Sequence, residues 1–181
     1  NLMRLSSLAY LEGFYYKPRV DHAVLAAHAE GLLALSACPK GEIASDLLAD
    51  RDDDALRTAG MYRDMFGADN YFLEIQNHGI DIEDKIRAKV VQLAARTGIP
   101  IVATNDCHYL DPDHVEAQDV LICIQTGKNV SDEKRMKAVS GLHFRSPDEM
   151  KQVFGDHPQA VLNTLAVAER CNLQLDFGKP L

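Results

Sequence analysis

Asp106 and His108 are the residues whose types and spacing most clearly offer chemistry. They follow the apolar run Ile99–Thr104 directly, with Cys107 between them. In an extended chain, residues i and i+2 project to the same side, so we expect the carboxylate and the imidazole to point together and Cys107 to point away. A carboxylate oxygen and an imidazole nitrogen are common ligands of divalent metals. The spacing therefore predicts a metal site, and the alternative is that Asp106 caps a turn and His108 is a half-buried polar residue.

Two further polar residues stand at the ends of apolar runs. Cys38 closes the run 32–38 and could supply a thiolate, although lone cysteines are usually small core residues. His78 follows the alternating run 71–76 and precedes Gly79. Cys38 is therefore a candidate ligand, and His78 is a candidate for a residue that supports the ligands, the alternative being that His78 only terminates a strand.

The other candidate groups carry weaker signals. We expect the remaining histidines to be solvated rather than catalytic; they are His22, His28, His114, His143 and His157. The loop 127–145 has a basic character that acidic residues dilute, and we expect it to be solvated; its cations include Lys128, Lys134, Arg135 and Lys137. The sequence contains no nucleophilic triad, Walker loop or GxGxxG fingerprint.

The elements that must position these residues alternate along the chain. Short apolar runs predict strands at 32–38, 71–76 and 99–104, and amphipathic patterns predict helices at 1–13, 21–30, 40–50, 55–66 and 82–96. Strands that alternate with helices indicate parallel βα units, so the expected class is α/β. In such folds active sites collect at the carboxyl ends of the strands, where Cys38, His78 and Asp106 stand.

Local signals set several boundaries. Asp21 is expected to cap the second helix, and Asp52 or Asp53 the helix that ends near Phe66. Gly98 is expected just past the end of helix 82–96. The final third of the chain predicts helices at about 114–126, 147–154 and 158–171.

The composition of the chain argues against some classes of function. The chain has 181 residues, 46% of them hydrophobic, and 19 Lys and Arg against 27 Asp and Glu, for a formal net charge of −8. This excess of acidic residues argues against a surface that binds nucleic acid by itself. No apolar run reaches the roughly 18 residues of a membrane span. We expect a cytoplasmic protein with reduced cysteines, and because the chain begins with Asn1 we expect a processed product or an excised piece.

Several blocks together resemble a known family. They are GFYYKPRVD (13–21), GLLALSACPKGEIA (31–44), YFLEIQNHGI (71–80), VATNDCHYLDPDHVEAQDVLICIQTGK (102–128), SPDEMKQVF (146–154) and NTLAVAERCNLQLDFGKPL (163–181). In register and over the whole chain, these blocks resemble the amino-terminal PHP (polymerase and histidinol phosphatase) domain of the alpha subunits of bacterial family C replicative DNA polymerases.

This resemblance implies a partial PHP-type barrel of about seven βα units with parallel strands, followed by a helical segment that leads toward the polymerase palm. It implies the carboxyl-terminal portion of the PHP domain at 1–145, and the end of the PHP domain with the connection toward the palm at 146–181. Cys38, Asp106 and His108 match three metal ligands of the family, for Zn, Mn or Fe, and His78 matches an HG turn without being a ligand. In family members that retain the full set of ligands, the site is linked to metal-dependent 3′–5′ exonuclease activity. Gln118 departs from the histidine of many relatives, and no catalytic role is attached to it.

For the parent protein the resemblance implies a Mg-dependent, DNA-directed DNA polymerase that acts on DNA and dNTPs, with a sliding clamp and a proofreading subunit as partners and no membrane. The remaining ligands would precede Asn1 and the polymerase carboxylates would follow Leu181, so residues 1–181 alone are expected to be inactive. Two alternatives are a free-standing PHP phosphoesterase, against which the tail 146–181 argues, and a non-enzymatic scaffold that docks a proofreading subunit, which the retained ligands disfavour. An error-prone paralogue of the family also stays open.

Overall fold

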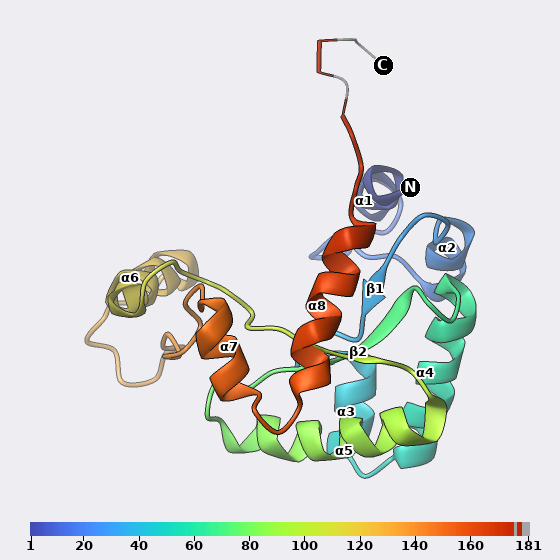
Figure 1. The fold of residues 1–181 in the computed structure, drawn as a ribbon. Helices are drawn as coiled ribbons and strands as arrows, with labels where there is room; N and C mark the ends of the chain where they lie inside the picture. Colours follow the sequence, from blue (N-terminus) through green and yellow to red (C-terminus); the bar gives the residue numbers. More distant parts are fainter. Residues whose placement is uncertain (176, 179–181) are drawn as a thin grey trace.

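The computed structural model describes residues 1–175, 177 and 178, so part of the predicted connection 146–181 lies outside the described residues. Its centre is a parallel sheet of three strands, β1 (Ala34–Leu35), β2 (Tyr71–Ile75) and β3 (Ile101–Ala103), in the order β1-β2-β3 (Figure 1). Ala34 pairs with Tyr71, and Leu73 pairs with Ile101. The prediction of an α/β fold with parallel strands is confirmed.

Helices connect the strands. Helices α1 (Leu2–Leu11) and α2 (His22–Ala27) precede β1, helices α3 (Glu42–Leu48) and α4 (Asp52–Phe66) link β1 to β2, and helix α5 (Asp81–Thr97) links β2 to β3. After β3 come the 3₁₀ helix η1 (Pro112–His114) and helices α6 (Val115–Thr126), α7 (Pro147–Val153) and α8 (Pro158–Arg170). None of the described helices combines the length and the hydrophobicity that a membrane span requires.

One face of the sheet carries the hydrophobic core. Tyr71, Leu73 and Ile75 alternate along β2 toward this face and are almost fully buried. Helices α3, α4 and α5 cover it with Ile43, Leu47, Ala55, Ala59, Ile86, Val90 and Leu93. The residues between them, Phe72 and Glu74, therefore point to the opposite face of the sheet, and Glu74 makes that face partly polar.

Most helix boundaries follow the predicted signals. Asp21 is the N-cap of α2, and its Oδ1 accepts the Val24 N–H at 2.8 Å, although α2 ends at Ala27, before the predicted Glu30. Gly98 ends α5 in the left-handed conformation, with φ 72°. The N-cap of α4 is Arg51, so Asp52 and Asp53 lie in the first helical turn, where their charges complement the helix dipole, instead of at the predicted capping position.

The first and third strands are shorter than the apolar runs predicted. Strand β1 ends at Leu35 because the Ser36 hydroxyl, at 2.8 Å, replaces a backbone carbonyl as acceptor for the Glu74 N–H. The chain then leaves the sheet at Ala37, whose φ is 67°. Strand β3 ends at Ala103, so Thr104 and the residues after it form a loop.

Only part of the final third of the chain packs against the sheet. Helix α8 lies along β3, where the Asn163 Nδ2 donates to the Ile101 carbonyl at 2.7 Å. Phe154 and Ala160 join the core on this side. By contrast, Figure 1 shows α6 on the side of the molecule opposite α4, well away from the sheet.

Candidate metal centre at the strand ends

Asp106 and His108 lie close together in the loop after β3. Asp106 has φ 45°, in the left-handed region, so the predicted extended geometry is wrong at this point. The His108 Nδ1 nevertheless lies 3.9 Å from the Asp106 Oδ1, because the turn at Asp106 folds the two side chains toward each other. The same Nδ1 is 2.6 Å from the Asp106 carbonyl oxygen, which can only accept, so Nδ1 carries the proton. The Nε2 atom is thereby left as the basic nitrogen.

Cys38 lies in the loop that follows β1, directly after the left-handed Ala37, and its side chain is half-buried. The loop closes tightly, since the Gly41 N–H donates to the Cys38 carbonyl at 2.8 Å. A Cβ atom at Gly41 would lie 2.6 Å from the Ser36 carbonyl oxygen. This close approach explains why a glycine stands here.

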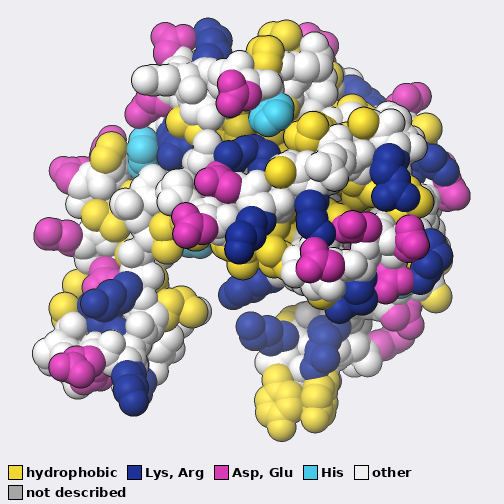
Figure 2. Space-filling model, turned by 90° about the horizontal axis from the view of Figure 1, so that it is seen from below, with side chains coloured by type: hydrophobic (Ala, Val, Ile, Leu, Met, Phe, Trp, Pro, Cys, Tyr) yellow, Lys and Arg dark blue, Asp and Glu magenta, His cyan; other side chains and the backbone are white. Residues whose placement is uncertain are grey.

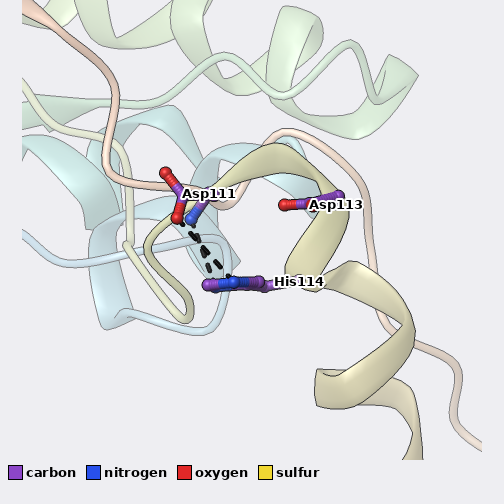
Figure 3. Close-up of side chains that lie close together, drawn as sticks. All are labelled: Asp111, Asp113 and His114. Carbon is purple, nitrogen blue, oxygen red and sulfur yellow. Dashed lines mark hydrogen bonds and ion pairs between the residues drawn. The ribbon is translucent and has the colours of Figure 1, made fainter.

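The three predicted ligands are brought together only in part. Asp106 and His108 approach each other, but Cys38 does not join them in a group whose ligand atoms lie within 4.8 Å of one another. Within the described residues such a group is formed by Asp111, Asp113 and His114, all of them exposed (Figure 3). Asp111 is the N-cap of η1 and His114 contacts the Asp111 backbone N–H, so helix capping explains this cluster.

The donor set at the strand ends suits a divalent metal. It combines a thiol, a carboxylate and an imidazole. One imidazole nitrogen is fixed by a carbonyl and the other has no hydrogen-bond partner among the described residues, an arrangement that suits metal binding. The side chains of His108 and Asp106 are 44% and 46% exposed, so an ion can reach them from solvent. Asp106 and His108 thus lie close together on the Nδ1 side of the imidazole, and the Nε2 of His108 and the thiol of Cys38 would both have to be brought to an ion held by Asp106.

His78 is buried in a polar network beside this loop. Its Nδ1 lies 2.7 Å from the Glu83 Oε1 and its Nε2 lies 2.8 Å from the Asn105 carbonyl oxygen. Its backbone N–H donates to the Glu83 Oε2 at 2.6 Å. The two side chains are only 2% and 6% exposed. Because both ring nitrogens face oxygen acceptors, His78 donates from both and pairs with an ionised Glu83.

Glu74 connects the strand ends across the sheet. Its Oε2 accepts the Ala37 N–H at 3.1 Å, beside Cys38. Its Oε1 accepts the Thr104 hydroxyl and, at 3.2 Å, the Gln76 amide. Glu74, Glu83 and Asn105 were not among the residues predicted for the site. A charged residue in the middle of the apolar strand YFLEI was the signal that could have identified Glu74.

His143 and Arg135 differ from their predicted solvated state. The His143 side chain is only 14% exposed, and its Nε2 lies 3.2 Å from the Glu149 Oε1. The backbone N–H of Ser146, followed by the hydroxyl of Ser146 and by His143, lowers the pKa of Glu149 to about 2. The other predicted solvated histidines include His22, which contacts Glu42 and is half exposed.

Arg135 is buried against α6 instead of facing solvent. Its Nη1 and Nη2 donate to the two carboxylate oxygens of Asp119 at 2.8 and 2.6 Å, and its side chain is 5% exposed. This bidentate bond and the Ala138 N–H lower the pKa of Asp119 to about 2. Arg135 is therefore unavailable to a phosphate backbone. Figure 2 shows Lys and Arg side chains interspersed with Asp and Glu on the face seen from below, without a continuous basic region.

Comparison with known proteins gives consistent matches. Residues 1–78 match the family model of the PHP domain. The chain is 48% identical over 182 residues to DNA polymerase III subunit alpha of Treponema pallidum, covering 100% of this chain and 16% of the relative. The corresponding proteins of Borreliella burgdorferi and Mycobacterium leprae are 39% and 40% identical over 183 residues, covering 100% and 99% of this chain and 16% of each relative.

The chain thus spans about one sixth of the length of these relatives, at 16%. The match extends over the strand ends that carry Cys38, His78, Asp106 and His108 as well as over the helices that cover the sheet. Along its whole length, the chain is thus similar to one segment of DNA polymerase III alpha subunits, and its first 78 residues match the PHP domain model, in agreement with the parallel α/β fold.

Proposed function

We propose that this chain is part of a replicative DNA polymerase, which joins dNTPs to a primer on a DNA template with Mg in the cytoplasm. The observation that carries the proposal is the identity of 39–48% to DNA polymerase III alpha subunits along the whole chain. Residues 1–145 would form the carboxyl-terminal portion of the PHP domain, and residues 146–181 would form the end of that domain and the connection toward the palm. Other subunits, such as a sliding clamp and a proofreading subunit, would be its partners.

Primer extension tests the polymerase assignment. The complete protein should extend a primed DNA template with dNTPs and Mg. Hydrolysis of a small phosphate ester without any extension would instead favour a free-standing phosphoesterase. Failure of both reactions would favour a non-catalytic scaffold.

Within this polymerase, we propose that Cys38, Asp106 and His108 bind a divalent metal, either Zn, Mn or Fe. The ligands would be the carboxylate of Asp106, the Nε2 of His108 and the thiolate of Cys38. The chemistry that such a metal supplies is activation of water and stabilisation of the leaving oxygen, which suits 3′–5′ exonuclease cleavage. The His108 Nδ1 bond to the Asp106 carbonyl supports this role, because it fixes the tautomer that coordination needs.

Metal content tests this site. Asp106→Ala and His108→Ala in the complete protein should each lower the bound metal and the thermal midpoint, as measured by elemental analysis and calorimetry. Asp113→Ala is the matched control, because Asp113 belongs to the exposed cluster with Asp111 and His114. Equal metal in wild type and Asp106→Ala, with loss in Asp113→Ala, would move the site to that cluster.

A further inference from the structure

Glu74 stands at the centre of the sheet with its carboxylate between two loops. Strand β2 lies between β1 and β3, so Glu74 faces the ends of both neighbours. One carboxylate oxygen accepts the Ala37 N–H at 3.1 Å, and the other accepts the Thr104 hydroxyl. Ala37 immediately precedes Cys38, and Thr104 lies two residues before Asp106. A single side chain thus contacts both loops that carry the predicted ligands.

Both loops adopt backbone conformations that need support. Ala37 has φ 67° and Asp106 has φ 45°, values that residues with a Cβ rarely adopt. Such conformations persist where surrounding contacts hold them, and they cluster at functional sites. At Ala37, the hydrogen bond to Glu74 is one of these contacts. The main chain of Glu74 contributes as well, since its N–H donates to the Ser36 hydroxyl at 2.8 Å.

The carboxylate of Glu74 accepts three hydrogen bonds. Its Oε1 also accepts the Gln76 amide at 3.2 Å, and that amide lies 3.3 Å from the Thr104 hydroxyl. With three donors directed at it, the carboxylate has a fixed orientation and little capacity left for a metal. Its geometry suits a brace between the loops better than a ligand.

We propose that Glu74 is a positioning residue that sets the loop of Cys38 relative to the loop of Asp106 and His108. This inference rests on the proposed metal site. Because Cys38 is separated from the Asp106–His108 pair by strand β2, its thiolate reaches a shared ion only if the two loops keep a defined relative position. The glutamate side chain is long enough for its carboxylate to contact both loops, whereas an aspartate side chain is one methylene too short.

Binding of Co²⁺ alone to the complete protein tests the proposal. We expect Glu74→Gln and Glu74→Asp to lower Co²⁺ affinity by about 10–100-fold, the range for residues that orient metal ligands. The sulfur-to-cobalt charge-transfer band should fall relative to the d–d bands, because Cys38 is the ligand that is displaced. Glu169→Gln, an exposed change at the end of α8, should bind Co²⁺ as the wild type does.

Thr104→Val serves as a milder variant, because it removes one hydrogen bond to Glu74 and keeps the shape of the side chain. It should weaken Co²⁺ binding to a smaller extent while circular dichroism of the apo protein stays unchanged. Wild-type affinity and spectrum in Glu74→Asp and Thr104→Val would overturn the role of Glu74. A different result would show that the proposed metal site is wrong: the wild type and Asp106→Ala would then bind Co²⁺ equally.

Discussion

Removal of the Glu83 side chain provides a quantitative test of the buried network. Glu83 accepts two hydrogen bonds from His78, one from Nδ1 at 2.7 Å and one from the backbone N–H at 2.6 Å. Both side chains are nearly inaccessible to water. Hydrogen bonds to a charged group contribute about 1.5–3 kcal/mol each, and removal of one partner of a buried ion pair costs about 3–5 kcal/mol. We therefore expect Glu83→Ala to lower the free energy of unfolding by about 3–5 kcal/mol.

The isosteric variant Glu83→Gln should behave differently. Its amide N–H can donate to the Nδ1 of a neutral His78, its carbonyl can accept the His78 backbone N–H, and the Nε2 bond to Asn105 is kept. All polar groups remain paired, so we expect a loss of about 1 kcal/mol or less. The double variant His78→Ala with Glu83→Ala should cost less than the sum of the single variants, because the two side chains interact only once.

Urea unfolding followed by circular dichroism measures these differences. With a slope of about 2 kcal/mol per molar urea, a loss of about 3–5 kcal/mol moves the midpoint of Glu83→Ala down by about 1.5–2.5 M. The midpoint of Glu83→Gln should fall by less than about 0.5 M. A Glu83→Ala midpoint within that smaller range, or strictly additive single and double variants, would refute the assignment of a buried His78–Glu83 pair.

Further predictions concern other polar groups. The Tyr71 hydroxyl is buried without a hydrogen-bond partner among the described residues, so Tyr71→Phe should keep or raise the urea midpoint. By contrast, Tyr62→Phe loses a 2.8 Å hydrogen bond to Glu42 and should lower the free energy of unfolding by about 1 kcal/mol. Asp119 has a pKa lowered to about 2, so it stabilises the protein above its ordinary pKa, and this contribution is lost as the pH falls from about 4 toward 2. Asp119→Asn should therefore flatten the pH dependence of the thermal midpoint in that window. Gly41→Ala should reduce Co²⁺ binding by the complete protein, because the new Cβ would collide with the Ser36 carbonyl beside Cys38.

Much of the fold was predictable because local chemistry agreed with the global arrangement. The Asp21 cap, Gly98 and the apolar periodicities fixed the order of helices and strands. Strand lengths were overestimated because apolar runs do not reveal side-chain substitutes for backbone hydrogen bonds, such as the Ser36 hydroxyl. The alternation of helices and strands predicted parallel strand pairing, but only the three-dimensional structure shows which residues of neighbouring strands pair.

The candidate site was predictable in composition rather than in geometry. The spacing of Asp106 and His108 identified a pair that does lie close together, although through a left-handed turn in place of an extended strand. The supporting groups were harder to find. Glu83 and His78 meet because α5 begins beside the end of β2, and Glu74 reaches Ala37 because β1 and β2 are neighbours. Such contacts depend on tertiary packing, which sequence spacing does not encode.

The order of the strands has a consequence for how the protein forms during synthesis. Strands β1, β2 and β3 are neighbours in the sheet in the same order as they occur in the chain. Each strand can pair with its predecessor as soon as it leaves the ribosome, so we expect the sheet to grow by one βα unit at a time. The edge of β3 is covered only when α8 arrives and Asn163 reaches the Ile101 carbonyl. The interval between synthesis of β3 and of α8 is then the period when the nascent chain most needs protection from aggregation.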